Sequence, residues 1–130
     1  MARGRAVLGL VAGGMLILSS AAHSLLGWPA LRGQLAAVPV PADLLLGLQI
    51  GWQFGGVAML AFGIVVVALF AKRFRGEDAS TGPAAVVAVA YLAFGCWALV
   101  ASRFEPFLLV FIVPGILLAL AVSSRAPARS

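Results

Sequence analysis

Few residues of this 130-residue chain could do chemistry, and they gather toward one end of its apolar segments. Gln49 and Gln53 stand four residues apart, so on a helix they project from one face. Counting about 1.5 Å per residue puts His23 level with Gln49, and Tyr91 level with Gln53. The sequence predicts an outward-facing polar funnel, with Asp43 near its mouth, and a candidate ligand site of these residues: His23, Gln49, Gln53, Tyr91, Arg103 and Glu105.

The same polar side chains have a second interpretation, in which they only join helices. Buried glutamine and serine side chains in membrane helices commonly form hydrogen bonds between helices, each contributing about 0.6 to 2 kcal/mol. In that case the Tyr91 hydroxyl is expected to bond Gln53, and His23 to bond a carbonyl or water. This structural interpretation is the favoured one, and the ligand site is the alternative.

The acidic residues argue against an enzyme. All of them lie at predicted helix ends or in loops: Asp43, Glu77, Asp78 and Glu105. This leaves no paired carboxylates, no Ser-His-acid set at one depth, and no titratable acid at mid-membrane for coupled transport. We therefore expect no catalytic residues.

No metal or cofactor is predicted. Cys96 is the only cysteine, so the chain cannot form an internal disulfide or a thiolate metal cluster. A haem bound through His23 would need a second axial ligand. That ligand would be Met15, Met59 or the His23 of a second copy of the chain. A quinone is the chemically easier candidate, because Gln53 or His23 could bond its carbonyl in a slot lined by these rings: Trp52, Trp97, Phe94 and Tyr91.

Composition indicates that the solvent around this chain is lipid. A chain with 63% hydrophobic and 10% charged residues has too little polar surface to cover a soluble globule. The formal net charge is +5, but the basic residues form short clusters between apolar runs rather than a stripe interleaved with aromatics. Nucleic acid is therefore not an expected partner.

Four apolar runs predict an all-α integral membrane four-helix bundle in a single domain, residues 1–130. Each run approaches the roughly 20 residues that a helix needs to cross about 30 Å of hydrocarbon. Gly27, Trp28 and Pro29 are expected to end the first helix. The predicted transmembrane helices cover 6–28, 43–71, 83–102 and 106–124.

The distribution of Lys and Arg predicts the orientation. One side would carry most of them, Arg3, Arg5, Lys72, Arg73, Arg75, Arg125 and Arg129. The other side would carry only Arg32 and Arg103. The positive-inside rule makes the first side cytoplasmic, with both termini inside. Ser20, Ala21 and Ala22 resemble a signal-peptide cleavage site, but the apolar stretch before them is longer than usual, and we expect the helix to be retained.

Small residues indicate how the helices associate. Gly47, Gly51 and Gly55 form a ridge at spacing four, and Gly9 and Gly13 repeat that spacing in the first helix. Lipid provides no hydrophobic force between helices, so close approach through small residues must contribute much of the association. Pro114 is expected to kink the fourth helix.

Two segments resemble small uncharacterised four-helix proteins of the bacterial inner membrane: AHSLLGWPALR at 22–32 and GLQIGWQFGGVAMLAFG at 47–63. The resemblance covers roughly the first half and implies that membrane location, with no known activity. We therefore expect a non-catalytic protein that self-associates or supports a partner subunit in a membrane complex through the glycine ridge. The alternative is a protein that binds or transports a small or lipophilic molecule in the polar funnel.

Overall fold

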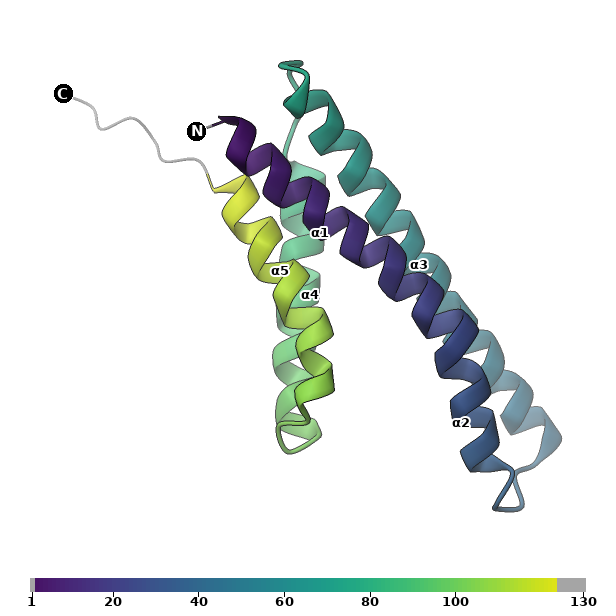
Figure 1. Ribbon diagram of the computed structural model, residues 1–130. Helices are drawn as coiled ribbons and strands as arrows, with labels where there is room; N and C mark the ends of the chain where they lie inside the picture. The colour runs from purple at the N-terminus through teal and green to yellow at the C-terminus, as the bar shows by residue number, and fades with distance from the viewer. Residues whose placement is uncertain (1, 124–130) are drawn as a thin grey trace.

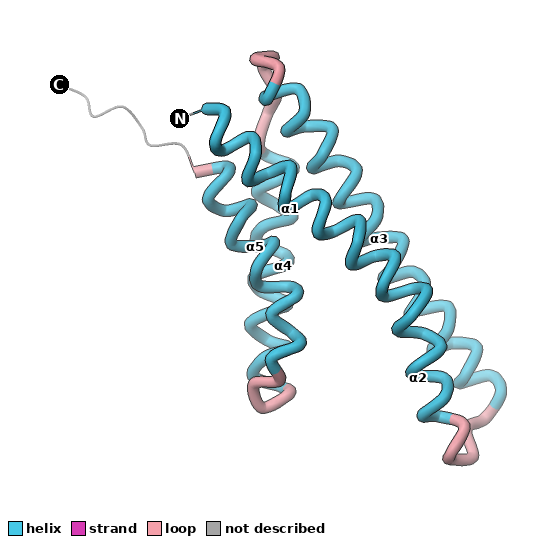
Figure 2. Tube along the Cα trace, in the orientation of Figure 1, coloured by secondary structure: helices cyan, strands magenta, loops and turns pink. Residues whose placement is uncertain are grey.

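The computed structural model describes residues 2–123, and every regular element within that range is helical (Figures 1 and 2). The first rod joins α1 (Ala2–Ala22), the π-helical turn η1 (His23–Gly27) and α2 (Trp28–Leu35). It is followed by α3 (Ala42–Phe74) and α4 (Gly82–Ala101). The 3₁₀ turn η2 (Pro106–Leu108) leads into α5 (Leu109–Val122). The predictions of an all-α chain and of four helical rods are confirmed.

Three of these rods are long and apolar enough to cross a membrane. The segments Arg3–Leu35 and Ala42–Phe74 each have 33 residues, and Gly82–Ala101 has 20. At about 1.5 Å per residue, the first two are about 50 Å long and the third about 30 Å. The fourth rod, Pro106–Val122, is apolar but shorter. Because the lengths are unequal, the two shorter rods can cover only part of the two longer ones.

The first rod does not end at Gly27–Pro29, so that prediction was wrong. The backbone instead widens into the π turn, where the Trp28 N–H donates to the carbonyl of His23. Pro29 then falls in the first turn of α2, where a missing N–H is tolerated. The rod continues to Leu35.

The rods form two antiparallel pairs that diverge from a common end (Figure 1). The first rod and α3 run side by side along their length, and α4 pairs with α5. The α4–α5 pair packs against α1 and α3, whereas within residues 2–123 η1 and α2 make no contact with it. The buried core therefore lies toward the end where the pairs meet: Ala6, Ala12, Leu16, Val66, Leu69, Phe70, Ala84, Val87, Ala88, Tyr91, Leu118 and Ala121.

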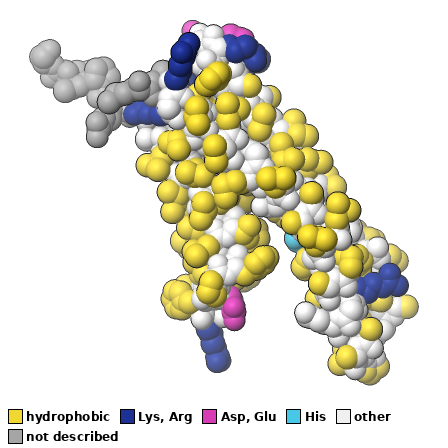
Figure 3. All heavy atoms as spheres, viewed as in Figure 1, with side chains coloured by type: hydrophobic (Ala, Val, Ile, Leu, Met, Phe, Trp, Pro, Cys, Tyr) yellow, Lys and Arg dark blue, Asp and Glu magenta, His cyan; other side chains and the backbone are white. Residues whose placement is uncertain are grey.

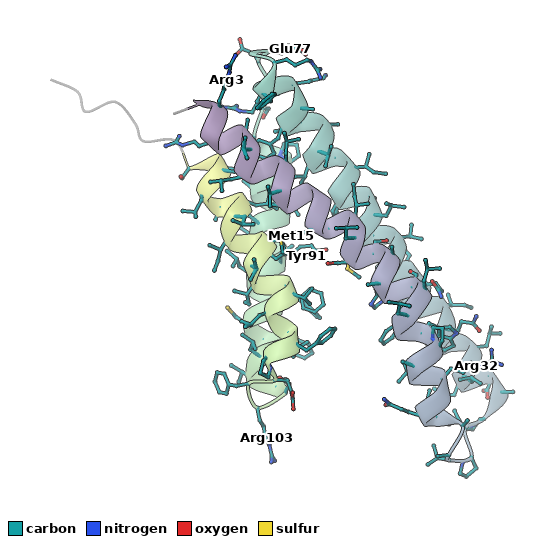
Figure 4. All side chains as sticks on the ribbon, viewed as in Figure 1. Arg3, Met15, Arg32, Glu77, Tyr91 and Arg103 are labelled. Carbon is teal, nitrogen blue, oxygen red and sulfur yellow. The ribbon has the colours of Figure 1, made fainter. Side chains whose placement is uncertain are left out.

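Charged residues mark the two ends. Arg3 and Glu77 lie at the end where the pairs meet, and Arg32 and Arg103 lie at the two separate tips (Figure 4). An apolar surface separates these ends (Figure 3). In the α3–α4 loop, a hydrogen bond from Arg75 lowers the pKa of the Glu77 carboxyl. The predicted charges at Arg125 and Arg129 lie outside the described residues.

Glycine lets the backbones of α1 and α3 come into contact. A Cβ added to Gly63 would lie 2.7 Å from Ile17 Cγ1 and 3.0 Å from the carbonyl oxygen of Gly13. Farther along the pair, the Ser20 hydroxyl donates a 2.8 Å hydrogen bond to the carbonyl of Gly56. Any larger residue at Gly63 must push the helices apart.

Glycines also lie at the close contacts between α4 and α5. A Cβ on Gly95 of α4 would lie 2.7 Å from Ile112 Cδ1, and one on Gly115 of α5 would lie 2.9 Å from Leu92 Cγ. Pro114 is buried inside α5, next to Gly115. The turn between α4 and α5 places Arg103 and Phe104 at φ 59° and 69°, a left-handed conformation that is rare without glycine.

We predict that Gly63→Ala destabilises the protein by about 1 to 3 kcal/mol, because it overpacks the α1–α3 contact. Gly14→Ala is the matched control, since an added Cβ there would meet no atom within 4 Å. Thermal unfolding in detergent, followed by circular dichroism, measures both. Equal stability of the two variants would contradict the close contact.

Candidate functional site

The predicted polar funnel is not assembled. Arg103 and Glu105 lie in the turn at the tip of the α4–α5 pair, and Arg32 lies at the other tip (Figure 4). Between residues 2 and 123, the only side-chain ion pair is Arg75–Glu77, at the opposite end. Arg103 and Glu105 therefore lie apart from Asp43, which is in the first turn of α3. The reason is that the two pairs diverge toward these tips.

The predicted bond between Tyr91 and Gln53 was also wrong. The Tyr91 hydroxyl is buried and has no hydrogen-bond partner in the part of the chain that the structure describes. Gln49 and Gln53 are partly exposed, and no side-chain hydrogen bond to another described residue involves either of them. Counting along helices gives the depth of a residue but not the direction in which its side chain points.

His23 and Trp52 hold each other through two hydrogen bonds. The His23 Nε2 lies 3.0 Å from the Trp52 carbonyl oxygen, which only accepts, so Nε2 carries the proton and donates. In return, the Trp52 indole nitrogen donates a 2.8 Å hydrogen bond to the His23 carbonyl. Their rings are stacked, with centroids 4.3 Å apart and planes within 3°. This is the kind of contact that the structural interpretation expects for a histidine.

From the sequence, Trp52 was expected only as one of the rings lining a quinone slot, and its two hydrogen bonds with His23 were not predicted. The signal was the level that Trp52 shares with His23 on the neighbouring helix, together with the glycines beside both residues. A Cβ on Gly27 would lie 2.9 Å from the Trp52 ring, and one on Gly55 would lie 3.3 Å from His23 Nε2. The glycines therefore make room for the two rings.

A cavity of about 350 Å³ lies between the two helical pairs. Its walls come from η1, α3, α4 and α5: His23, Gly55, Ala58, Met59, Phe62, Ala90, Tyr91, Phe94 and Phe111. Figure 3 shows the hollow between the pairs, with the histidine side chain at its edge. Of the predicted ligand residues, the structure brings only His23 and Tyr91 to this cavity.

The glycine ridge lies in a second, shallower hollow of about 470 Å³. We call this hollow the open face of α3, and it is lined by His23, Leu44, Gly47, Leu48, Gly51, Trp52 and Gly55. Among the described residues, a Cβ added to Gly47 or Gly51 would meet no atom within 4 Å. In contrast, a Cβ on Gly9 would overlap the Phe70 side chain, and one on Gly13 would overlap Val67. Gly47 and Gly51 are therefore not used to pack the described part of the chain, whereas Gly55, at the end of the ridge, makes room for His23.

Within residues 2–123, no three His, Cys, Asp or Glu side chains lie close enough together to hold a metal ion. Met59, a candidate haem ligand, lines the cavity beside His23, but the His23 Nε2 already bonds Trp52. Comparisons of the chain with protein-family models, curated proteins and solved structures give no match.

We predict that the His23–Trp52 contact stabilises the α1–α3 pair. Trp52→Phe keeps a ring but removes the N–H donor, and should lower stability by about 0.5 to 1.5 kcal/mol. His23→Phe removes the other donor, and the double variant should show a coupling of at least about 0.5 kcal/mol. Trp97→Phe is the control, because Trp97 is 65% exposed. A Trp52→Phe loss no larger than the Trp97→Phe loss in thermal unfolding would refute the contact.

Proposed function

We propose that this chain is a non-catalytic integral membrane protein that binds another membrane helix along the open face of α3. The helix belongs to a second copy of the chain or to a partner subunit that the protein supports in a complex. The observation that carries the proposal is the unfilled glycine ridge. Within residues 2–123, a Cβ added to a glycine at a helix contact would overlap the neighbouring helix, whereas a Cβ on Gly47 or Gly51 would meet no atom within 4 Å.

The residues around the ridge suit a helix as the occupant. In lipid, helices associate through close van der Waals packing and interhelical hydrogen bonds, and small residues permit that approach. Leu44 is 54% exposed and Leu48 is 41% exposed, so two leucines flank the glycines and are free to pack against an incoming helix. Four-residue spacing along the ridge matches the groove that a helix of another chain would enter.

Helix length also favours association. A rod of about 50 Å exceeds the hydrocarbon thickness of about 30 Å, and a tilt of about 40° still leaves about 38 Å. The outer ends of the first rod and of α3 therefore project toward the membrane surface. There Leu46 and Ile50 are exposed, at 56% and 63%. A second helix covering this segment would pack against these exposed apolar side chains.

The proposed location is the bacterial inner membrane, with both termini in the cytoplasm. Arg3, Arg5 and the basic residues that end α3 are at the end where the helical pairs meet, and Arg32 and Arg103 are at the separate tips. This asymmetry supports a cytoplasmic position for the common end through the positive-inside rule.

The orientation is tested by cysteine labelling in a Cys96→Ser background. Ser80 lies in the α3–α4 loop and Val38 in the α2–α3 loop, and both are exposed. A membrane-impermeant maleimide added to spheroplasts should label Val38→Cys, and should label Ser80→Cys only after permeabilisation. The reverse pattern would invert the proposed topology.

The association is tested with Gly51→Leu. Because the site is open within the chain, the variant should keep its helical content and thermal stability, but its side chain would block a helix from the ridge. We expect its assembly to weaken at least about tenfold, which corresponds to about 1.4 kcal/mol. Native mass spectrometry of the gently extracted protein measures the complex.

Gly33→Leu is the matched control, because an added Cβ at Gly33 also meets nothing within 4 Å but lies on α2, away from the ridge. An unchanged complex in the Gly51→Leu variant, or an equal loss in both variants, would refute association through this face.

A further inference from the structure

Tyr91 carries the one polar atom that the packing of residues 2–123 leaves unexplained. Its side chain is 7% exposed, and its hydroxyl is the only buried side-chain nitrogen or oxygen atom in that range without a hydrogen-bond partner. Leaving a buried hydroxyl unpaired costs about 1 to 3 kcal/mol, because lipid and apolar side chains cannot replace water as a partner. Phenylalanine would fill the same space without that cost.

The cavity beside Tyr91 is apolar and aromatic. Phe62, Phe94 and Phe111 line it together with Met59. The rings of Phe94 and Phe111 meet edge to face, with centroids 4.9 Å apart, so the aromatic wall is itself packed. A volume of about 350 Å³ lies within the range of small-molecule pockets. Such walls favour a flat ring.

Depth restricts which molecules can bring an acceptor to Tyr91. Tyr91 lies near the middle of α4, so its Cα is about 15 Å from either end of that helix. If α4 spans the membrane, this is the centre of the hydrocarbon. Phospholipid esters lie at the membrane surface and cannot reach it. A ring carbonyl on a molecule that dissolves in the hydrocarbon can.

We propose that the cavity binds a quinone-class molecule, with its ring between the two helical pairs and one carbonyl accepting a hydrogen bond from Tyr91. Tyr91 is the donor because the Nε2 proton of His23, the other polar side chain in the lining, is used by the Trp52 carbonyl. Figure 4 places Tyr91 where α4 meets the α1–α3 pair, at the inner end of the hollow. This site differs from the outward polar funnel and borders the open face of α3 at His23 and Gly55.

In this proposal, rotation of the Met59 side chain opens the way from the cavity to the Tyr91 hydroxyl. The Tyr91 hydroxyl is buried, so an acceptor reaches it only after a neighbouring side chain rotates. Met59 lines the cavity and packs against the core cluster that contains Tyr91. Its unbranched side chain is the most adaptable in the lining.

The test measures binding of a decyl-substituted benzoquinone to the full-length protein in lipid nanodiscs, by native mass spectrometry across a titration. We expect one saturable adduct per chain, and Tyr91→Phe should weaken it about tenfold through loss of the hydrogen bond. Decylbenzene, which has no carbonyl, should bind the two proteins equally. No saturable adduct, or an affinity unchanged by Tyr91→Phe, would overturn the proposal.

A matched pair of α4 variants tests the location. Ala90 lines the cavity and Ala93 does not, and both are exposed. Ala90→Phe should abolish the adduct by filling the cavity, and Ala93→Phe should leave it unchanged. Equal binding by the two variants would place the ligand elsewhere.

Thermal unfolding without the probe separates binding from a structural role of the hydroxyl. Tyr91→Phe should be at least as stable as the unchanged protein, because no internal hydrogen bond is lost. A loss of stability would mean that the hydroxyl bonds the protein itself, and would overturn the proposal. The proposal would also be overturned if the protein carried a bound phospholipid, identified by its mass, that the quinone did not displace.

Discussion

The closeness of α1 and α3 determines where every other part of this molecule can lie. In the proposed membrane location, no hydrophobic force holds the helices together, so packing and interhelical hydrogen bonds must do so. The Gly13–Gly63 contact leaves no room for a Cβ, and the Ser20 hydroxyl reaches the Gly56 carbonyl farther along. His23 and Trp52 continue the same interface with two more hydrogen bonds to backbone carbonyls. These contacts fix the register of two rods over most of their length.

Because that pair is long and the α4–α5 pair is short, one part of α3 is packed and another is open. The short pair occupies the end near the charged α3–α4 loop, where Val66 and Phe70 are fully buried. Toward the start of α3, Ile50 and Phe54 are 63% and 72% exposed instead. The cavity at Tyr91 lies at the boundary between the packed part and the open part. The open face of α3 and the cavity at Tyr91 thus arise from one difference in length.

Composition and apolar run length were enough to predict four helices, and glycine spacing correctly marked Gly9 and Gly13 as contact points. The end of the first helix could not be predicted, because a π turn carries the chain through Gly27 and Pro29 and has no sequence signature of its own. The funnel failed for another reason. Residue counting gives the height of a side chain, but rotation about the helix axis and the divergence of the pairs decide whether Gln53 meets Tyr91.

The polar groups near the cavity differ in how the structure satisfies them. His23 and Trp52 satisfy each other, so replacing either one leaves the partner with an unmet donor or carbonyl. The Tyr91 hydroxyl has no hydrogen-bond partner within the described chain, yet Tyr91 lies in the core cluster beside the cavity. Packing accounts for its ring but not for its hydroxyl, since lipid offers no water to compensate a buried donor. A hydroxyl retained there at an energetic cost is therefore best explained by an acceptor that enters from the membrane.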